Sequence, residues 1–329
     1  MPTIHGVLSI NPEIETEQIV SAIRKQVRET LRRRGAVLGL SGGIDSSVCA
    51  ALCVRALGNE NVLGLLLPER DSSSDSTRLG TLIAESLRIT YQREEITSIL
   101  EGAGCYRRQL EAIRMIFPDA TEEWKFKITL PPILDSERLP VSYLDIRLPS
   151  GETRKERIPL GAYQQLVAAT NFKQRTRKML EYYHADRMHY AVCGTPNRLE
   201  YDQGFFVKNG DGSADFKPIA HLYKSQVYQL AAYLGLPEEI QRQLPTTDTF
   251  SFPQTQEEFY FRLPYEQMDL CLYGLNNGQS AEETASHSGL SSSQVERVYN
   301  DIRAKRRATR YLHLPPLLVS NVYGIDSHQ

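Results

Sequence analysis

The chain has 329 residues, enough for one large or two modest domains. Its 38 basic and 40 acidic residues leave no strong overall charge to draw it onto DNA or a membrane surface. The five cysteines form no CxxC pair, which fits a reducing compartment better than a disulfide framework. The sequence shows neither a basic-then-apolar leader nor an apolar run of about 18 residues. We therefore expect a cytoplasmic protein that binds neither membrane nor nucleic acid.

Predicted helices and strands alternate along the first part of the chain. Apolar residues at three- and four-residue steps between Ile19 and Leu31 predict an amphipathic helix that ends by Gly35. Short apolar runs without polar alternation predict buried parallel strands at 36–40, 61–67, 89–91 and 190–195. Helical spacing predicts helices at 45–57, 75–88 and 222–235. This order predicts an α/β fold with a doubly wound parallel sheet.

The stretch 101–163 interrupts this alternation. Within it, 143–160 alternates apolar and polar residues on both sides of Ser150-Gly151, which predicts an inserted β-hairpin. The end of the chain is helical, with helices expected at 265–273, 281–289 and 293–307. We therefore expect one domain over residues 1–310 that contains the insert, followed by a C-terminal tail over 311–329.

The sequence LGLSGGIDSS, residues 38–47, joins the first predicted strand to the next helix. Ligands of open α/β sheets bind at the carboxyl ends of the strands, where helix N-termini leave N–H groups unpaired and partly positive. Gly42 and Gly43 let the backbone approach an anion closely, and Ser41, Ser46 and Ser47 add hydroxyl donors. The pattern therefore predicts a nest for a pyrophosphate.

Asp45 is the unusual member of this loop, because a bare carboxylate repels phosphate. It fits if Mg²⁺ lies between the two, since hard cations take carboxylate and phosphate oxygens together. The alternative is a glycine turn in which Asp45 or a serine caps the helix. No lysine follows the glycines, so this is not the GxxxxGK[ST] loop of kinases. It resembles the PP-loop of the N-type ATP pyrophosphatases, which split ATP between the α and β phosphates.

Four further segments extend the resemblance. They are NFKQRTR at 171–177, CGTPNRLEYDQGFFVKNGDGSADFKPIAHLYKSQV at 193–227, PTTDTFSFPQT at 245–255 and AKRR at 304–307. With the PP-loop, they follow the order of the NAD synthetase family. The chain is thus similar to that family over residues 20–310 apart from the insert. The resemblance implies an adenine nucleotide alpha hydrolase-like, Rossmann-like fold.

The resemblance also implies a role for each matching residue. For ATP binding it implies Leu40, Ser41, Gly42, Gly43, Ile44, Asp45, Ser46, Ser47, Thr195, Lys224 and Thr246. For binding of nicotinic acid adenine dinucleotide it implies Asn171, Arg175, Lys208, Asp215 and Lys305. It implies that Asp45 and Glu200 share Mg²⁺ and act in catalysis together with Lys224.

The implied reaction is the ATP-dependent amidation of nicotinic acid adenine dinucleotide (deamido-NAD) to NAD. Hydroxide is a poor leaving group, so the acid is first converted to an acyl adenylate with release of pyrophosphate, and ammonia then displaces AMP. Because the PP-loop unit begins near the start of the sequence, the resemblance implies an ammonia-dependent enzyme, or a synthetase subunit fed by a separate glutaminase. It also implies a homodimer whose dinucleotide pocket is built partly across the interface near Arg175.

Three departures from the family pattern leave open a PP-loop ligase that amidates a different carboxylate. They are the insert, Ala304 where the family often has histidine, and EEFYFRLPYEQMD at 257–269 in place of a more acidic run. A helix–turn–helix interpretation of 281–298 is disfavoured, because Arg297 is the only basic residue within 291–298 and phosphate contacts dominate DNA affinity. tRNA thiolation is disfavoured because the sequence shows no reactive cysteine pair.

Overall fold

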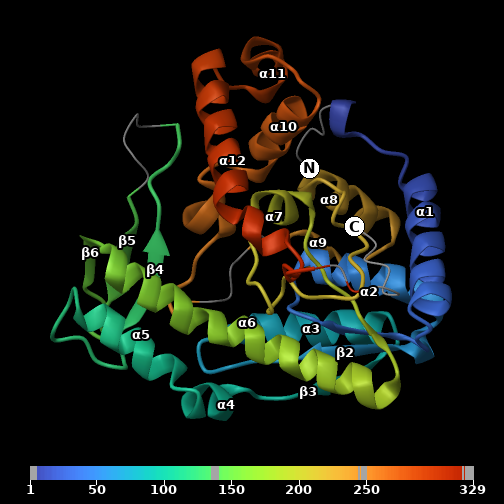
Figure 1. The fold of residues 1–329 in the computed structure, drawn as a ribbon, viewed down its shortest axis with the longest axis horizontal. Coiled ribbons are helices and arrows are strands. Elements are labelled where there is room, and N and C mark those ends of the chain that lie inside the picture. Colours follow the sequence, from blue (N-terminus) through green and yellow to red (C-terminus); the bar gives the residue numbers. More distant parts are fainter. Residues whose placement is uncertain (1–5, 135–140, 244, 246–249, 321, 323–329) are drawn as a thin grey trace.

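A parallel sheet with the strand order β3-β2-β1-β7 forms the centre of this computed structural model, which describes residues 6–134, 141–243, 245, 250–320 and 322 (Figure 1). The strands are β1 (Ala36–Gly39), β2 (Val62–Leu66), β3 (Thr90–Arg93) and β7 (Ala191–Val192). Ala36 of the central strand β1 pairs with Val62 on one side and Ala191 on the other. The chain therefore moves outwards from β1 to β3 and then crosses back to β7. This confirms the expected doubly wound sheet.

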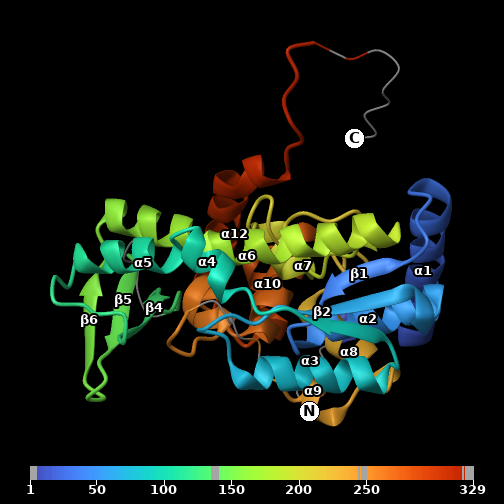
Figure 2. The ribbon, with the colours of Figure 1, turned by 90° about the horizontal axis from the view of Figure 1, so that it is seen from below.

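Helices cover both faces of the sheet (Figure 2). On one face pack α1 (Pro12–Arg24), α2 (Ile44–Leu57), α3 (Ser74–Ser86) and α8 (Lys224–Tyr233), and on the other α4 (Thr97–Gly102), α5 (Cys105–Arg114) and α6 (Leu160–Met188). Side-chain alternation along β1 sends Leu38 to the first face and Val37 to the second, and both are fully buried. Burial on both faces explains why these strands are continuous apolar runs.

The first helix begins earlier than its apolar periodicity predicts. Asn11 caps it, because the Asn11 side chain accepts hydrogen bonds from the N–H groups of Glu13 and Ile14. Pro12 takes the first helical position, where a missing N–H costs nothing. A π-helical segment, Lys25–Thr30, then continues α1.

A second, antiparallel sheet lies beside the first and consists of β4 (Lys125–Thr129), β5 (Tyr143–Arg147) and β6 (Thr153–Arg157). β5 and β6 form the expected hairpin, and Gly151 in its turn takes a φ of +88°. β4 is not predicted by the sequence. Its Phe126 and Ile128 are buried against α5, α6 and Phe250, so this outer sheet has a small core of its own.

The chain ends in helices, as expected: α10 (Tyr265–Asn276), α11 (Ala281–Ser288) and α12 (Ser292–His313). Their core packs against the short helix α7 (Arg198–Gln203) through Leu199. Another short helix, α9 (Glu238–Gln241), follows α8. Residues 314–320 leave the end of α12 as an irregular tail (Figure 2). Among the described residues, no helix is long and apolar enough to cross a bilayer.

Candidate active site

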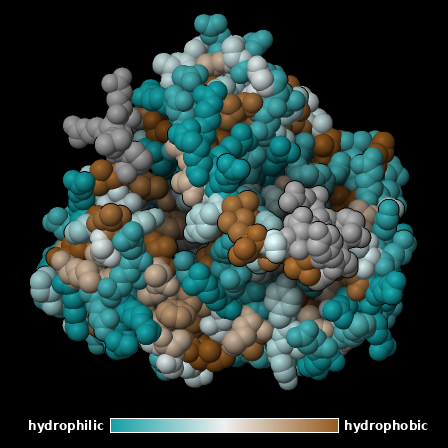
Figure 3. Space-filling view, viewed as in Figure 1, coloured by the Kyte–Doolittle hydropathy of each residue, from teal (hydrophilic) through white to brown (hydrophobic). Residues whose placement is uncertain are grey.

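A cleft of about 1380 Å³ opens at the carboxyl ends of β1 and β2. Its walls come from the glycine loop (Ser41–Ser47), the loop after β2, helix α6 and the last turns of α12. The face in Figure 3 is hollowed between the outer sheet and α12, with hydrophilic and hydrophobic side chains interspersed around the hollow. Pockets for one ligand usually measure roughly 300–1,000 Å³. The volume of this cleft exceeds that range.

The two glycines of the glycine loop have different roles. Gly42 takes a left-handed φ of +76°, and a Cβ at this position would lie 2.6 Å from Leu79 Cβ and 2.9 Å from Ser76 O. Gly42 thus lets α3 approach the loop closely. Gly43 is the N-cap of α2, and no side chain caps this helix. The first N–H groups of α2 are therefore available to an anion in the cleft.

The serine hydroxyls shape the loop from inside. Ser46 Oγ and Ser47 Oγ donate to the carbonyl oxygen of Gly43 over 3.0 and 2.9 Å. The Gly43 N–H donates to Ser41 Oγ over 3.3 Å. Ser41 and Ser46 line the cleft, whereas Ser47 is fully buried beneath the loop. Ser47 therefore supports the loop conformation and lies away from the cleft surface.

Asp45 and Glu200, the two acids expected to share a metal ion, meet at Asn197. Asn197 Nδ2 donates to Asp45 Oδ1 over 3.1 Å, and the Asn197 N–H donates to Glu200 Oε2 over 3.1 Å. The Glu200 N–H donates back to Asn197 Oδ1, so the two residues form a capping box that begins α7. The second oxygen of Glu200 accepts a 2.9 Å hydrogen bond from Gln256 Nε2. Glu200 thus both caps helix α7 and lines the cleft.

Lys224 completes this group, which we call the cleft cluster (Asp45, Glu200 and Lys224). Its side chain is 3% exposed, and its ammonium forms an ion pair with Asp45 Oδ2. Lys224 is the first residue of α8, and the fully buried Asp269 holds this helix start. The Asp269 carboxylate accepts the N–H groups of Lys224 and Ser225 over 3.2 and 2.7 Å. The lysine is therefore positioned by its backbone as well as by its ion pair.

The charges of the cleft cluster are not balanced. Burial, and then the neighbouring Asp45, raise the pKa of Glu200 to about 7, although Lys224 opposes this. Burial disfavours the charge on Lys224, but Asp45 and Glu200 outweigh it and raise the pKa of the lysine. A further cation would stabilise both carboxylates in their ionised form.

The donor set fits a hard divalent cation. Carboxylate oxygens are the ligands that Mg²⁺ prefers, and it commonly takes one or two of them together with substrate phosphates. Within the described ranges, no three His, Cys, Asp or Glu side chains gather to form a complete metal site. Asp45 and Glu200 can therefore hold Mg²⁺ with phosphate oxygens as its other ligands.

Most of the residues predicted for the site line the cleft. They are Leu40, Ser41, Gly42, Gly43, Ile44, Asp45, Ser46, Asn171, Arg175, Thr195, Glu200, Lys208 and Lys224. Lys208 Nζ donates to the carbonyl oxygens of Tyr311 and Leu314 over 2.9 and 3.1 Å. It thereby holds the end of α12 at the cleft.

Besides Ser47, three predicted residues lie outside the cleft lining or outside the described residues. Asp215 is absent from the cleft lining, and its carboxylate accepts the Val192 N–H over 2.7 Å at the end of β7. Lys305 is also absent from the lining, and its ammonium lies 2.7 Å from Asp301 Oδ2. Thr246 lies outside the described residues. A role for these three toward a substrate stays a prediction.

The structure adds residues to the site that the sequence analysis missed. Asn197 is one, and the Asn-x-x-Glu spacing of a capping box could have identified it. Lys178 and Glu181 of α6 form a buried ion pair of 2.6 Å that lines the cleft beside the end of β1. The half-buried Asp211 also lines the cleft and accepts the Val207 N–H over 2.7 Å. No local pattern distinguishes the pair on α6 from ordinary surface charges.

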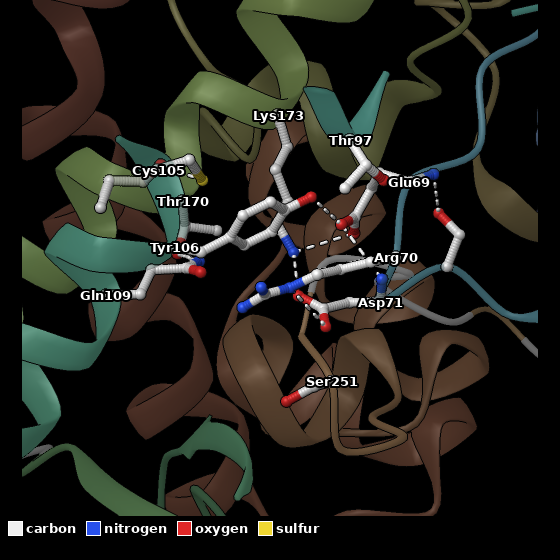
Figure 4. Close-up of polar contacts among 12 residues, drawn as sticks. Glu69, Arg70, Asp71, Thr97, Cys105, Tyr106, Gln109, Thr170, Lys173 and Ser251 are labelled. Atoms are coloured by element: carbon white, nitrogen blue, oxygen red, sulfur yellow. Dashed lines mark hydrogen bonds and ion pairs between the residues drawn. The ribbon is translucent and has the colours of Figure 1, made fainter. Parts of the chain in front are cut away.

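A second lysine–carboxylate group lies at one wall of the cleft, with Asp71 in the lining and Glu69 and Lys173 buried behind it, and we call it the closed cluster (Glu69, Asp71 and Lys173; Figure 4). Lys173 Nζ lies 2.9 Å from Glu69 Oε1 and 2.7 Å from Asp71 Oδ2, and the side chains of Lys173 and Glu69 are 0% exposed. Tyr106 of α5 donates to Glu69 Oε2 over 2.8 Å. Burial raises the pKa of Glu69, but Lys173 outweighs this, so that the pKa is lowered overall.

Sequence comparisons match most of the chain to one family. A family model described as NAD synthase matches residues 15–113 and 140–310, which include the cleft cluster. The NH(3)-dependent NAD(+) synthetase of Mesorhizobium japonicum is 59% identical over 312 residues, which cover 95% of this chain and 98% of that protein. The protein of the same name from Rhizobium meliloti is 57% identical over 319 residues, which cover 97% and 95%.

Solved structures give the same picture of the fold. The NH3-dependent NAD synthetase of Campylobacter jejuni superposes with a TM-score of 0.61 at 25% identity, over 94% of this chain and 100% of that one. An NMN synthetase from Francisella tularensis superposes with a TM-score of 0.64 at 23% identity, over 94% and 99%. At this low identity, the second similarity supports the fold alone.

Proposed function

This chain belongs to the NAD synthase family, and we propose that it uses ATP and ammonia to amidate deamido-NAD to NAD in the cleft. The observation that carries the proposal is the cleft cluster. Two carboxylates and a lysine from three distant segments meet beside a helix start that is open to an anion. The relatives that match nearly the whole chain are named for ammonia-dependent NAD synthesis.

The reaction requires two displacements in one place. The acceptor carboxylate attacks the α-phosphorus of ATP, the bond to the β-phosphate oxygen breaks, and pyrophosphate leaves. Ammonia then attacks the acyl carbon of the adenylate, AMP leaves with the bonding electron pair, and the nitrogen loses a proton. The N–H groups at the start of α2 bind the departing pyrophosphate, and Lys224 offsets negative charge beside Asp45.

Asp45 and Glu200 would hold Mg²⁺ together with phosphate oxygens. When bound, the ion neutralises charge that builds up on the phosphates during transfer. Two observations support this assignment: Asn197 brings the two carboxylates together, and burial, followed by the neighbouring Asp45, raises the pKa of Glu200, so that a further cation would favour its ionised form. Asn197 and Gln256 orient Glu200 for this task through hydrogen bonds.

The acceptor dinucleotide is expected beside α6. Asn171, Arg175 and Lys208 line that part of the cleft, which supports their proposed contacts with it. Thr195 also lines the cleft and is proposed to contact ATP. Asp215 and Lys305 are proposed to contact the dinucleotide in a homodimer, whose second subunit completes the pocket.

The direct test measures pyrophosphate and AMP released from ATP, Mg²⁺ and ammonium, with deamido-NAD and with a panel of other carboxylic acids. We expect release that depends on deamido-NAD and produces NAD in equal amount. Preference for another acid would support the alternative ligase, and release without any acceptor would contradict amidation. A second assay replaces ammonium with glutamine as the nitrogen source. We expect NAD formation from glutamine only when a separate glutaminase is added.

Three further features of the proposal have their own tests. Light scattering at micromolar concentration should give the mass of a dimer, and a monomer with and without ATP would remove that part. Limited proteolysis should cut the proposed insert, 101–163, before the segment 36–67 within the domain 1–310. A cytoplasmic location is supported by five buried free thiols, and fractionation of cells tests it.

A further inference from the structure

The loop after β2, residues 67–73, forms one wall of the cleft, and Arg70, Asp71 and Ser72 are among its lining residues. The loop is folded around Glu69. The Glu69 N–H donates to Ser72 Oγ over 3.2 Å, and the Asp71 N–H donates to Glu69 Oε2 over 3.1 Å. The conformation of this wall therefore depends on where the Glu69 carboxylate is held.

The Glu69 carboxylate is held by two elements from elsewhere in the chain. Lys173 of α6 contacts one oxygen and Tyr106 of α5 the other, and Lys173 also contacts Asp71 (Figure 4). Burying charges is costly unless the geometry is good and the hydrogen bonds are complete. Here both carboxylates contact a lysine that is fully buried. Such an arrangement permits few positions of the loop.

Helix α6 also contacts the loop 67–73 one turn further along the helix, through Arg177. Arg177 follows Lys173 at i+4, so the two side chains leave the same face of the helix. Arg177 Nε donates to the carbonyl oxygen of Leu67 over 3.2 Å, and its Nη2 donates to Ser72 Oγ over 3.4 Å. Both ends of the loop are thus attached to α6.

The same helix carries Asn171 and Arg175, the proposed contacts of the acceptor. One element therefore carries the proposed acceptor contacts, and through Lys173 it also holds the loop 67–73, which leads into α3 beside Gly42 of the glycine loop. Resting on the proposed function, we propose that Lys173 is a positioning residue for adenylation: it sets the loop 67–73 relative to the acceptor-binding face of α6. The effect is a fixed distance between the two substrates.

Substitutions in the closed cluster should therefore alter substrate use. Lys173→Met leaves the buried Glu69 without its cation and leaves Asp71 with Arg70 alone, 3.8 Å away, so the loop must move. We expect the KM for ATP to rise about tenfold and kcat to fall by a similar factor, since a small misplacement of reacting groups is costly. Lys173→Arg keeps the charge and should recover part of both. Tyr106→Phe removes one hydrogen bond from Glu69, and should raise the KM for ATP about three- to fivefold.

Lys155→Met is the matched control. Lys155 also forms an ion pair with an aspartate, with its Nζ 3.4 Å from Asp145 Oδ1, but it lies in the outer sheet and not in the cleft lining. We expect its kinetic constants to equal those of the wild type. A role in folding alone would lower kcat in proportion to the folded fraction and leave the KM for ATP unchanged.

The experiment measures kcat and both KM values of the full chain well below its melting temperature, and ATP binding by equilibrium dialysis. A raised KM and dissociation constant for ATP in Lys173→Met or Tyr106→Phe, with Lys155→Met unchanged, supports the proposal. Wild-type values in Tyr106→Phe, together with wild-type values or no folded protein for Lys173→Met, would overturn it. Failure of the wild type to make NAD would instead contradict the proposed function, and dialysis would still decide the role of Lys173.

Discussion

The cleft cluster and the closed cluster contain the same charged groups, one lysine and two carboxylates, in different surroundings. In the closed cluster, the lysine contacts both acids directly, and Tyr106 fills a remaining acceptor position. In the cleft cluster, Lys224 forms an ion pair with Asp45, whereas Glu200 receives its hydrogen bonds from uncharged groups. In addition, Arg70 Nε lies 3.8 Å from Asp71 Oδ1, so the closed cluster has a second cation beside it, whereas the cleft cluster can take another one.

The pKa shifts express this difference. The pKa of Glu69 is lowered, because Lys173 outweighs the burial that raises it. The pKa of Glu200 is raised to about 7 by burial and by Asp45, and Lys224 does not outweigh them. A buried carboxylate with a lowered pKa stabilises structure, and one with a raised pKa beside a cleft marks a candidate functional site. The two clusters differ mainly in how completely each carboxylate is paired with charged or hydrogen-bonding partners, and less in their residue types.

The largest difference between the clusters should appear in stability. Lys173→Met should lower the free energy of unfolding by about 3–5 kcal/mol, the usual loss when one partner of a buried ion pair is removed. Lys224→Met should lower it less, because Glu200 can take up a proton near neutral pH and the cleft admits water. Urea denaturation at pH 7 measures both, with Lys155→Met as an exposed control. Equal losses of unfolding free energy in Lys173→Met and Lys224→Met would contradict the proposed difference between the two clusters.

For activity we expect the opposite ranking: substitutions in the cleft cluster should reduce the rate more than substitutions in the closed cluster. Asp45→Asn and Glu200→Gln should each lower the rate of pyrophosphate formation by about a hundredfold or more, while the melting temperature changes little. Glutamine keeps the capping box with Asn197, so this variant isolates the charge of Glu200. The double variant should lose much less than the product of the two, because both residues serve one ion.

A wild-type rate at saturating Mg²⁺ for either single variant would contradict the two-carboxylate metal site. The helix-capping alternative makes the opposite prediction, with altered melting and nearly normal turnover. Mg²⁺ titrations of the rate and thermal melting, run on the three variants together, distinguish these outcomes.

The glycine loop next to the cleft cluster has no counterpart in the closed cluster, and its two glycines should not be equivalent. Gly42→Ala should cost about 1–3 kcal/mol, because it forces a side chain into a left-handed conformation and against Leu79. Gly43→Ala should cost less, since φ is −79° and the nearest atom to its Cβ is Ser41 Oγ at 3.3 Å. Thermal melting of both variants tests this, and equal losses would contradict it.

The smallest expected effect is the pH dependence of the closed cluster. The folded-state pKa of Glu69 lies below its unfolded value, so its stabilising contribution is present above the unfolded pKa of about 4.3 and is lost as pH falls through the folded pKa. The stability difference between the wild type and Glu69→Gln should therefore shrink as pH falls from 5 towards 3. Urea denaturation across this range measures it. A difference that stays constant would show that Glu69 has an ordinary pKa.

Local patterns were enough to predict the parallel sheet, the hairpin around Ser150-Gly151 and the three C-terminal helices. Each depends on signals within a short window, such as a continuous apolar run or a turn flanked by alternation. β4 was not predicted, because its alternation of apolar and polar residues is short. The apolar residues of β4 are buried only by α5, α6 and Phe250, which come from other parts of the chain. The full length of α6 escaped for a related reason: it packs on both sheets, so its apolar residues do not form a single stripe.

By itself, the sequence determined the strand–loop–helix unit and the place of Asp45 at the start of its helix, because glycines, serines and Asp45 act through their immediate backbone. It did not identify Glu181 and Asp211, which also line the cleft. Only the tertiary structure decided which distant side chains complete the site. It brought Asn197 to Asp45 across 152 positions and Lys173 to Glu69 across 104. It also gave Asp215 and Lys305 local partners away from the cleft lining. The physical reason is that the energy of a charged side chain depends on its burial and its partners, and the fold supplies both.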